Sequence, residues 1–164
     1  MSDRILTTEP LTAAAFAPWG DVIEAAGAPD QMINNGAGRR FHDRARIDFT
    51  DGRAGISLID SAPRALPLRI DMVERHPLGS QAFIPVDGTP MLVVVADDEG
   101  GKPVRLRAFL SQPGQGVNLH RGSWHGPLAP MGARGVYAVV DYIGGGNNLE
   151  VHTFDEAFVV EGIA

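Results

Sequence analysis

Residues 114–127 read GQGVNLHRGSWHGP, and this stretch decides how the rest of the chain is interpreted. It holds His120, Arg121, Trp124 and His125 between glycines and prolines. Glycine and proline mark turns, and turns on a rigid scaffold often carry binding and catalytic groups. Taken alone, the stretch fits a hairpin whose histidines do no chemistry equally well, so its interpretation depends on the remaining sequence.

The composition is that of an ordinary globular chain. Its 164 residues suit one domain, residues 1–164, and 44% of them are hydrophobic and 21% charged. The 20 glycines and 12 prolines divide the chain into short pieces, which argues against a helical bundle. The chain has no cysteine, which excludes disulfides and thiolate catalysis and is compatible with a reducing cytoplasm.

Charge and hydropathy argue against two classes of partner. The net charge is −6 and no basic stripe occurs, so we expect no nucleic-acid partner. The N-terminal MSDRILTTEPL lacks the apolar run of a signal peptide, and the apolar residues 91–96 are too few to span a bilayer. We therefore expect a cytoplasmic protein without a membrane partner.

Most of the chain follows the pattern of short strands separated by turns. Residues 68–72 alternate apolar and charged side chains, as in a half-buried strand, and residues 91–96 read as a fully buried strand. The expected strands are residues 20–24, 55–60, 68–74, 81–85, 91–96, 104–110, 135–143 and 150–154. At least eight short strands predict an all-β sandwich or barrel.

Other segments give weaker signals. Residues 11–19 predict a helix of about two turns, with Thr12 as its N-cap and Pro18 as its stop. Residues 97–103 read as a charged hairpin loop, and the tail from residue 155 reads as either a short helix or an edge element. Asn34 and Asn35, followed by glycine, predict a turn.

Residues 40–44 read RFHDR and place Arg40, His42 and Arg44 on one side of any extended segment. Such a side is either a solvated strand face or an anion-binding wall.

Two stretches share the spacing of a known pair of motifs. Residues 68–88 and 114–129 resemble the cupin motifs G-x5-H-x-H-x3-4-E-x6-G and G-x5-P-x-G-x2-H-x3-N. His76 and His125 keep their motif positions. Five positions depart from the motifs, with Leu68 for glycine, Glu74 for histidine, Gln81 for glutamate, His120 for proline and Ala129 for asparagine. The resemblance implies a cupin-like double-stranded β-helix, or jelly-roll barrel, with a short N-terminal helix.

The same positions suggest a metal site. Glu74 and His76 are two residues apart, so on an extended chain they point to the same side. With His125 they form a set of two histidines and one carboxylate, to which Gln81 adds a weak oxygen donor. Nitrogen and oxygen ligands without sulfur suit Ni, Mn, Fe, Co or Zn. The alternative is a metal-free barrel whose polar interior hydrogen-bonds a ligand.

The sequence also resembles one particular family. The stretches INNG (residues 33–36), RFHD (40–43), ERHPLGSQAFIP (74–85) and GVNLHRGSWHGPL (116–128) are similar to ureidoglycolate lyases, and the similarity runs from about residue 11 to 158. This resemblance implies a cupin-like homodimer that acts in allantoin degradation and splits ureidoglycolate into glyoxylate and urea. It also implies a divalent metal, usually nickel, and a small anionic substrate.

That reaction needs a base, an acid and an anchor for the carboxylate. His120 is the first candidate base, Glu74 is the second, and His76 completes the expected catalytic set. The carboxylate is expected to pair with an arginine, and the urea group with amide side chains, while Trp124 forms either an apolar wall or ordinary core. The arginines are Arg40, Arg75 and Arg121, and the amides are Asn34, Asn35 and Gln81.

Two other functions fit the residues. Two histidines and one carboxylate also describe the facial triad of an iron-dependent oxygenase. A cupin-like barrel can also be a non-catalytic module that binds a small molecule.

Overall fold

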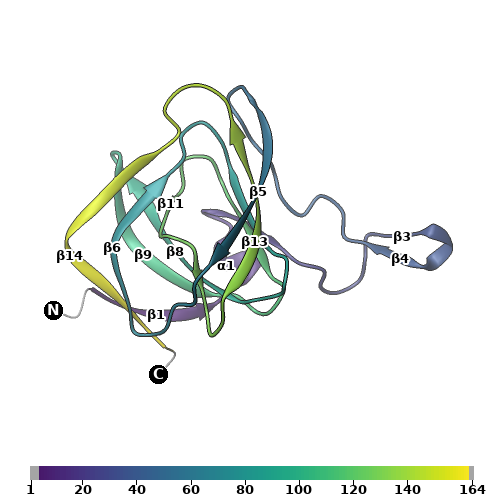
Figure 1. Ribbon diagram of the computed structural model, residues 1–164, viewed down its shortest axis with the longest axis horizontal. Helices are drawn as coiled ribbons and strands as arrows, with labels where there is room; N and C mark the ends of the chain where they lie inside the picture. The colour runs from purple at the N-terminus through teal and green to yellow at the C-terminus, as the bar shows by residue number, and fades with distance from the viewer. Residues whose placement is uncertain (1–3, 163–164) are drawn as a thin grey trace.

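The computed structural model describes residues 4–162 and consists almost entirely of β-strands arranged in two facing sheets (Figure 1). The first sheet contains, in spatial order, β11 (Trp124–His125), β6 (Leu68–Arg75), β14 (Glu150–Glu161), β1 (Ile5–Pro10), β9 (Lys102–Leu110), β8 (Met91–Glu99) and β12 (Ala129–Pro130). The second contains β2 (Gly20–Ile23), β10 (Gly116–Leu119), β7 (Gln81–Pro85), β13 (Gly135–Ile143) and β5 (Arg53–Ser61). The predicted cupin-like, all-β barrel is therefore confirmed.

The two-residue strand β11 closes the first sheet into a ring. His125 pairs with Glu74 of β6 on one side and with Val95 of β8 on the other. Trp124 pairs with Ala96 of β8. Closure removes two exposed edges from the sheet, and it also fixes His125 directly opposite Glu74.

The core has two parts, and β8 contributes to both. Met91, Val93 and Val95 pack between the two sheets with residues of β2, β7, β10 and β13. The alternate residues of β8 pack inside the first sheet with residues of β6, β9 and β14. Because successive side chains of a strand point to opposite faces, the uninterrupted apolar run of residues 91–96 is what a strand buried on both faces requires.

All eight expected strands occur; residues 81–85 and 135–143 have the expected ends, and the other six strands differ at one end or both. The hairpin predicted at residues 97–103 is confirmed, but its loop is shorter than predicted, because β8 continues to Glu99 and β9 begins at Lys102. Gly100 and Gly101 make the turn, and their φ values of 60° and 83° suit glycine. Residues 155–161 of the tail belong to β14 and form no helix, while residues 163–164 lie outside the described part of the chain. The polar β1, which pairs in parallel with β14 and β9, was not predicted.

The helix α1 (Ala13–Phe16) lies where it was expected but has only one turn. The predicted cap is confirmed, since Thr12 Oγ1 accepts a hydrogen bond from Ala15 N at 3.2 Å. Pro18 lacks a backbone donor, so the helix does not continue through it. No helix within residues 4–162 is both long and apolar enough to cross a membrane.

A hairpin projects from the barrel at residues 27–46, here called the arm (Figure 1). It contains β3 (Gln31–Ile33), the 3-10 turn η2 (Asn34–Gly36) and β4 (Gly38–Arg40). The turn predicted at Asn34 and Asn35 is confirmed, and both residues have φ near 55°. The extended face predicted for residues 40–44 is wrong, because β4 ends at Arg40 and Asp43 has a φ of 50°.

Candidate metal centre

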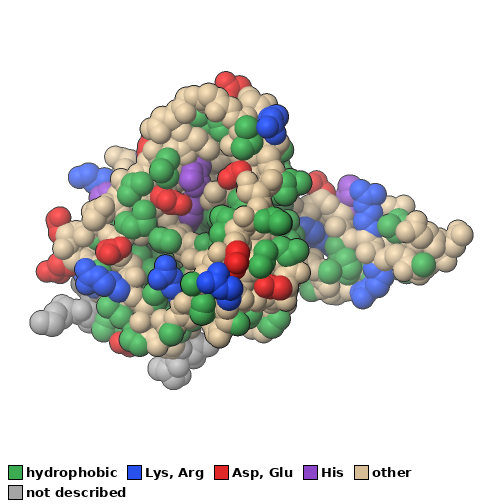
Figure 2. Space-filling model, viewed as in Figure 1, with side chains coloured by type: hydrophobic (Ala, Val, Ile, Leu, Met, Phe, Trp, Pro, Cys, Tyr) green, Lys and Arg blue, Asp and Glu red, His purple; other side chains and the backbone are tan. Residues whose placement is uncertain are grey.

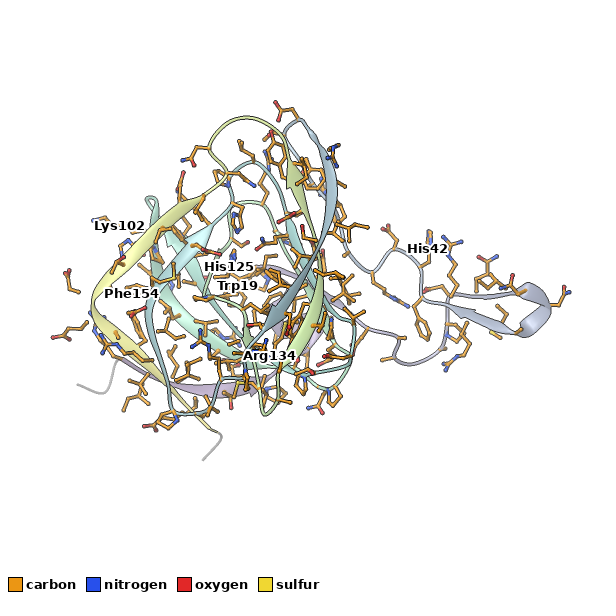
Figure 3. The ribbon with its side chains drawn as sticks, viewed as in Figure 1. Trp19, His42, Lys102, His125, Arg134 and Phe154 are labelled. Carbon is orange, nitrogen blue, oxygen red and sulfur yellow. The ribbon has the colours of Figure 1, made fainter. Side chains whose placement is uncertain are left out.

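Three side chains with ligand atoms converge inside the barrel. Glu74 lies near the end of β6, His76 follows that strand, and His125 lies in β11. One ligand atom of each residue lies within 4.8 Å of those of the other two. Figure 2 shows histidine side chains in a hollow of the visible face, and Figure 3 places His125 inside the barrel. The structure thus brings together three of the four residues that the motif spacing predicts as ligands.

Backbone carbonyls orient both imidazole rings. His125 Nδ1 lies 3.0 Å from the carbonyl oxygen of Ser123, and His76 Nδ1 lies 2.7 Å from that of Asn148. A carbonyl oxygen can only accept a hydrogen bond, so each Nδ1 carries the proton. In the neutral rings each Nε2 is then left with a free lone pair. These two atoms lie 3.6 and 3.8 Å from the same oxygen, Oε1 of Glu74.

The set fits a cation. The Nε2 atoms of His76 and His125 are buried and have no hydrogen-bond partner. The Oε1 atom of Gln81 is also buried and also lacks a partner. The amide nitrogen of Gln81 donates to Asp141 Oδ2 at 3.3 Å, which leaves Oε1 as the free end. Lone pairs facing a carboxylate without a donor are costly to bury unless a positive charge lies among them. The nitrogen and oxygen donors suit a divalent transition metal.

The carboxylate of this centre is ionised at neutral pH. When the His125 ring is protonated, its hydrogen bond to the carboxylate is the main cause that lowers the pKa of the Glu74 carboxyl below its ordinary value. Burial opposes this effect, and the charge of a protonated His76 ring adds to it. Glu74 therefore supplies the one negative ligand of the set, leaving a formal charge of +1 around a divalent ion.

His120 lies in a different group of residues. Its Nε2 is 3.2 Å from Asp21 Oδ1, and it lines a cavity of about 240 Å³ with Arg46, Asp48 and Arg121. Burial alone would raise the pKa of Asp21, but hydrogen bonds from Asn118, the Arg46 backbone and His120 lower it overall. Among residues 4–162, no hydrogen bond or ion pair joins the His120 side chain to Glu74, His76 or His125. Its predicted role as the base stays a prediction.

Two residues expected to bind substrate are occupied by other contacts. Arg75 donates to Glu150 at 2.6 Å and to Asp98 at 2.8 Å, and its guanidinium lies 4.4 Å from the centre of the Trp124 ring. Trp124 belongs to the core within the first sheet and donates to Asp98 at 2.8 Å. Trp124 and its neighbour His125 point to opposite faces of β11, so these contacts favour the core interpretation of the tryptophan.

The other expected binding residues are scattered. Arg121 pairs with Asp48 at 3.1 Å beside His120. Asn34, Asn35 and Arg40 lie on the arm, which projects away from the barrel that holds the centre (Figure 1). Figure 3 shows His42 on the same projecting segment. Of the predicted amides, only Gln81 lies on the barrel.

Sequence reasoning missed the residues that hold the ligands in place. Asn148 accepts from His76 with its carbonyl and from Leu78 N with its side chain, the latter at 2.8 Å. Asp141 fixes the orientation of Gln81, which is its cross-strand neighbour between β13 and β7. Residues 144–148, GGGNN, indicate only a flexible turn, and nothing in their spacing connects them to His76.

The fold and the centre together define a cupin-like barrel with a centre of two histidines and one carboxylate, suited to a divalent metal. A family model described as ureidoglycolate lyase matches residues 3–161. The chain belongs to the ureidoglycolate lyase family, a family of enzymes, as its resemblance predicted.

Relatives match over almost their whole length. The ureidoglycolate lyase of Rhodobacter capsulatus is 60% identical over 158 residues, which cover 96% of this chain and 98% of the relative. That of Chelativorans sp. is 48% identical, with 96% of each chain covered. Ureidoglycolate lyase 1 of Rhizobium meliloti is 49% identical, covering 96% of this chain and 94% of the relative.

Asn148→Ala is expected to weaken binding of a divalent metal by about 10-fold or more, because it releases the loop whose carbonyl orients His76. Calorimetric titration of the metal-free protein with Ni²⁺ measures the change. Asn147→Ala is the matched control, since its side chain is exposed and accepts only from Leu149 N at 3.3 Å. Equal affinities in the two variants would contradict the role of Asn148.

Proposed function

We propose that the chain is a ureidoglycolate lyase that converts ureidoglycolate into glyoxylate and urea in allantoin degradation. The observation that carries the proposal is the donor-free set of Glu74, His76 and His125 in a chain whose relatives, at 48–60% identity, are named for this reaction. One carboxylate and otherwise neutral ligands leave a formal charge of +1 around a divalent ion. Such a centre attracts a small anionic substrate.

The reaction is the cleavage of a hemiaminal. Ureidoglycolate carries a hydroxyl, a carboxylate and a ureido nitrogen on one carbon. The hydroxyl loses its proton, the oxygen forms the C=O bond of glyoxylate, and the C–N bond breaks with its electron pair going to nitrogen. A proton then completes urea, so no water is added and atoms and charges balance.

We expect Glu74, His76, His125 and Gln81 Oε1 to hold a divalent ion, with nickel as the metal named by the resemblance. Such an ion supplies a Lewis acid that lowers the pKa of a coordinated hydroxyl. The protein's contribution is to fix the ligands before substrate arrives, through the carbonyls of Ser123 and Asn148.

For the proton acceptor we propose Asp141. It lies on β13 two residues from Val139, so it faces the same interior as that core residue, and it is half-buried beside Gln81. Unlike Glu74, it is outside the ligand set and so is free to take the hydroxyl proton and return it to the departing nitrogen. His120 is the rival base, oriented by Asp21.

The first test is a direct assay with measured metal content. We expect the metal-loaded protein to release urea and glyoxylate in equal amounts without oxygen uptake, and chelation to abolish the activity, which Ni²⁺ restores. Oxygen consumption in place of urea release would support the oxygenase instead. Ligand-dependent melting without turnover would support a non-catalytic binding module.

Asp141→Asn is expected to lower kcat by about 100-fold or more while leaving metal content unchanged, because the amide still accepts from Gln81 but cannot take a proton. His120→Ala is the comparison variant, and its kcat is expected to stay within a few-fold of wild type. A near-normal kcat in Asp141→Asn together with a collapse in His120→Ala would assign the base to His120.

We further propose a homodimer, working in the cytoplasm as the sequence predicts, in which the arm of each single-domain chain docks on a second copy. β3 and β4 pair only with each other, and an isolated two-stranded hairpin is marginally stable in water. The arm has four arginines and two aspartates in a chain of net charge −6, so it is complementary in charge to the rest of the molecule.

Two exposed apolar features support this arrangement. Met32 on the arm is 51% exposed. Ile56 and Leu58 are 77% and 69% exposed on β5, whose outer edge is unpaired within the described residues. Asn34, Asn35 and Arg40 keep their predicted role in substrate binding only if the arm delivers them to the partner's centre.

Met32→Asp is expected to weaken dimerisation by about 10-fold or more, since it places a charge in a buried apolar contact. Sedimentation velocity over a range of concentrations measures the dissociation constant. Ile5→Asp is the control, because Ile5 is 49% exposed but lies on β1, away from the arm. A monomeric wild type, or equal dissociation constants in the two variants, would refute the interface.

A further inference from the structure

The loop between β13 and β14, residues 144–148, carries the carbonyl that orients His76, and it arches over one end of the barrel (Figure 1). Asn148 at its end makes two contacts, from its carbonyl oxygen to His76 Nδ1 at 2.7 Å and from its side chain to Leu78 N at 2.8 Å. The loop begins with three successive glycines, which lose more conformational freedom on ordering than other residues. The orientation of His76 therefore depends on what holds this loop in place.

Tyr142, near the end of β13, is the side chain against which the loop packs. It is 7% exposed, and its Oη donates to Asp51 Oδ1 at 2.5 Å and has the carbonyl oxygen of Gly145 as a second acceptor at 2.9 Å. A Cβ added at Gly144 would collide with the same Oη, so the backbone of the loop lies directly on the phenol. The hydrogen bond to Asp51 is the main cause that raises the pKa of Tyr142, so the hydroxyl keeps its proton at neutral pH and donates.

The same ring also contacts the segment that joins the expected ligands His76 and Gln81. A Cβ added at Gly79 would lie 2.7 Å from Tyr142 Cβ and 2.6 Å from the ring of Phe49. Phe49 pairs with Gly79 through an isolated β-bridge, and its ring centre lies 6.0 Å from that of Tyr142. Tyr142 thus lies between the loop that orients His76 and the segment that carries His76.

We propose that Tyr142 is a positioning residue of the metal centre, whose hydroxyl holds the glycine loop so that Asn148 fixes the His76 ring. The assignment rests on the proposed function in taking Glu74, His76 and His125 as metal ligands. The phenol acts through the loop and is not itself a ligand. Groups that orient a metal ligand from outside typically change metal affinity by about 10- to 100-fold when they are removed.

Tyr142→Phe keeps the ring and removes only the hydroxyl. In the metal-free protein we expect hydrogen exchange of the Leu78 amide to become about 5-fold faster or more, because Asn148 is no longer held against it. Calorimetry is expected to show Ni²⁺ binding weakened by about 10-fold or more. The visible absorption of bound Co²⁺, which depends on the geometry of the ligands, is expected to change as well.

Tyr137→Phe is the matched control. Tyr137 lies on the same strand, is fully buried, and its hydroxyl also donates to backbone carbonyls, those of Thr89 at 3.0 Å and Pro90 at 3.2 Å. Its variant is expected to lose stability through the lost hydrogen bond while keeping the wild-type Leu78 exchange, Ni²⁺ affinity and Co²⁺ spectrum.

Gly144→Ala tests the same contact from the side of the loop. The added methyl group collides with Tyr142 Oη and displaces the loop while the tyrosine stays in place. Gly145→Ala is its control, because a Cβ there meets no atom within 4 Å. We expect Gly144→Ala to reproduce the faster Leu78 exchange and the weaker Ni²⁺ binding, and Gly145→Ala to behave as wild type. This pair decides the question if Tyr142→Phe does not fold.

Unchanged Ni²⁺ affinity in Tyr142→Phe and Gly144→Ala would overturn the proposal, even with faster Leu78 exchange. Equal losses of affinity in Tyr137→Phe would also overturn it, since they would reflect stability alone. A wild type that binds no Ni²⁺ would refute the proposed metal centre, and Leu78 exchange would still decide whether Tyr142 holds the loop. Tyr142-dependent Ni²⁺ binding without any release of urea would refute the proposed function and leave the positioning role standing.

Discussion

The structure depends on one electrostatic constraint. Two histidine nitrogen lone pairs and a carboxylate face one another inside the barrel, and no hydrogen-bond donor lies among them. The Nδ1 protons of His76 and His125 are committed to backbone carbonyls, so both Nε2 atoms face Glu74 as acceptors. Burying such a set is unfavourable unless a cation joins it, so a cation bound at this centre would stabilise the folded state. The two-residue strand β11 creates the constraint, because closing the first sheet places His125 opposite Glu74.

The same strand joins the site to the core. Trp124 packs inside the first sheet, while the next residue, His125, points to the opposite face and contributes its ring to the centre. A shift of one residue in the pairing of β11 would exchange these faces, burying the histidine in the apolar core and directing the indole at Glu74. Packing of Trp124 against residues of β6 and β8, together with its hydrogen bond to Asp98, therefore sets the register on which the centre depends.

A feature of this protein could be predicted from the sequence when its signal lies within one short segment of the chain. The strands were predictable from alternation and apolar runs, and His76 and His125 from a motif whose spacing reflects the strand geometry of one fold. Asn148 and Asp141 were not predictable, because 72 and 60 residues separate them from the side chains they hold, and only the pairing of distant strands brings them near. β1 was missed because ILTTEP has no apolar alternation, and the structure uses it as a bridge between β14 and β9.

An acidic protein that acts on an anion needs positive charge at its binding site, although its net charge is negative. With a net charge of −6 the protein repels anions at long range, but physiological salt screens exposed charges beyond about 8 Å. Within that distance, attraction depends on the centre, which has a single carboxylate ligand. Arg75 and Arg121, two of the arginines expected to pair with the substrate, are neutralised by Glu150, Asp98 and Asp48. Attraction of a small carboxylate therefore depends on which positive charges lack a partner, and this is set by the fold and not by the composition.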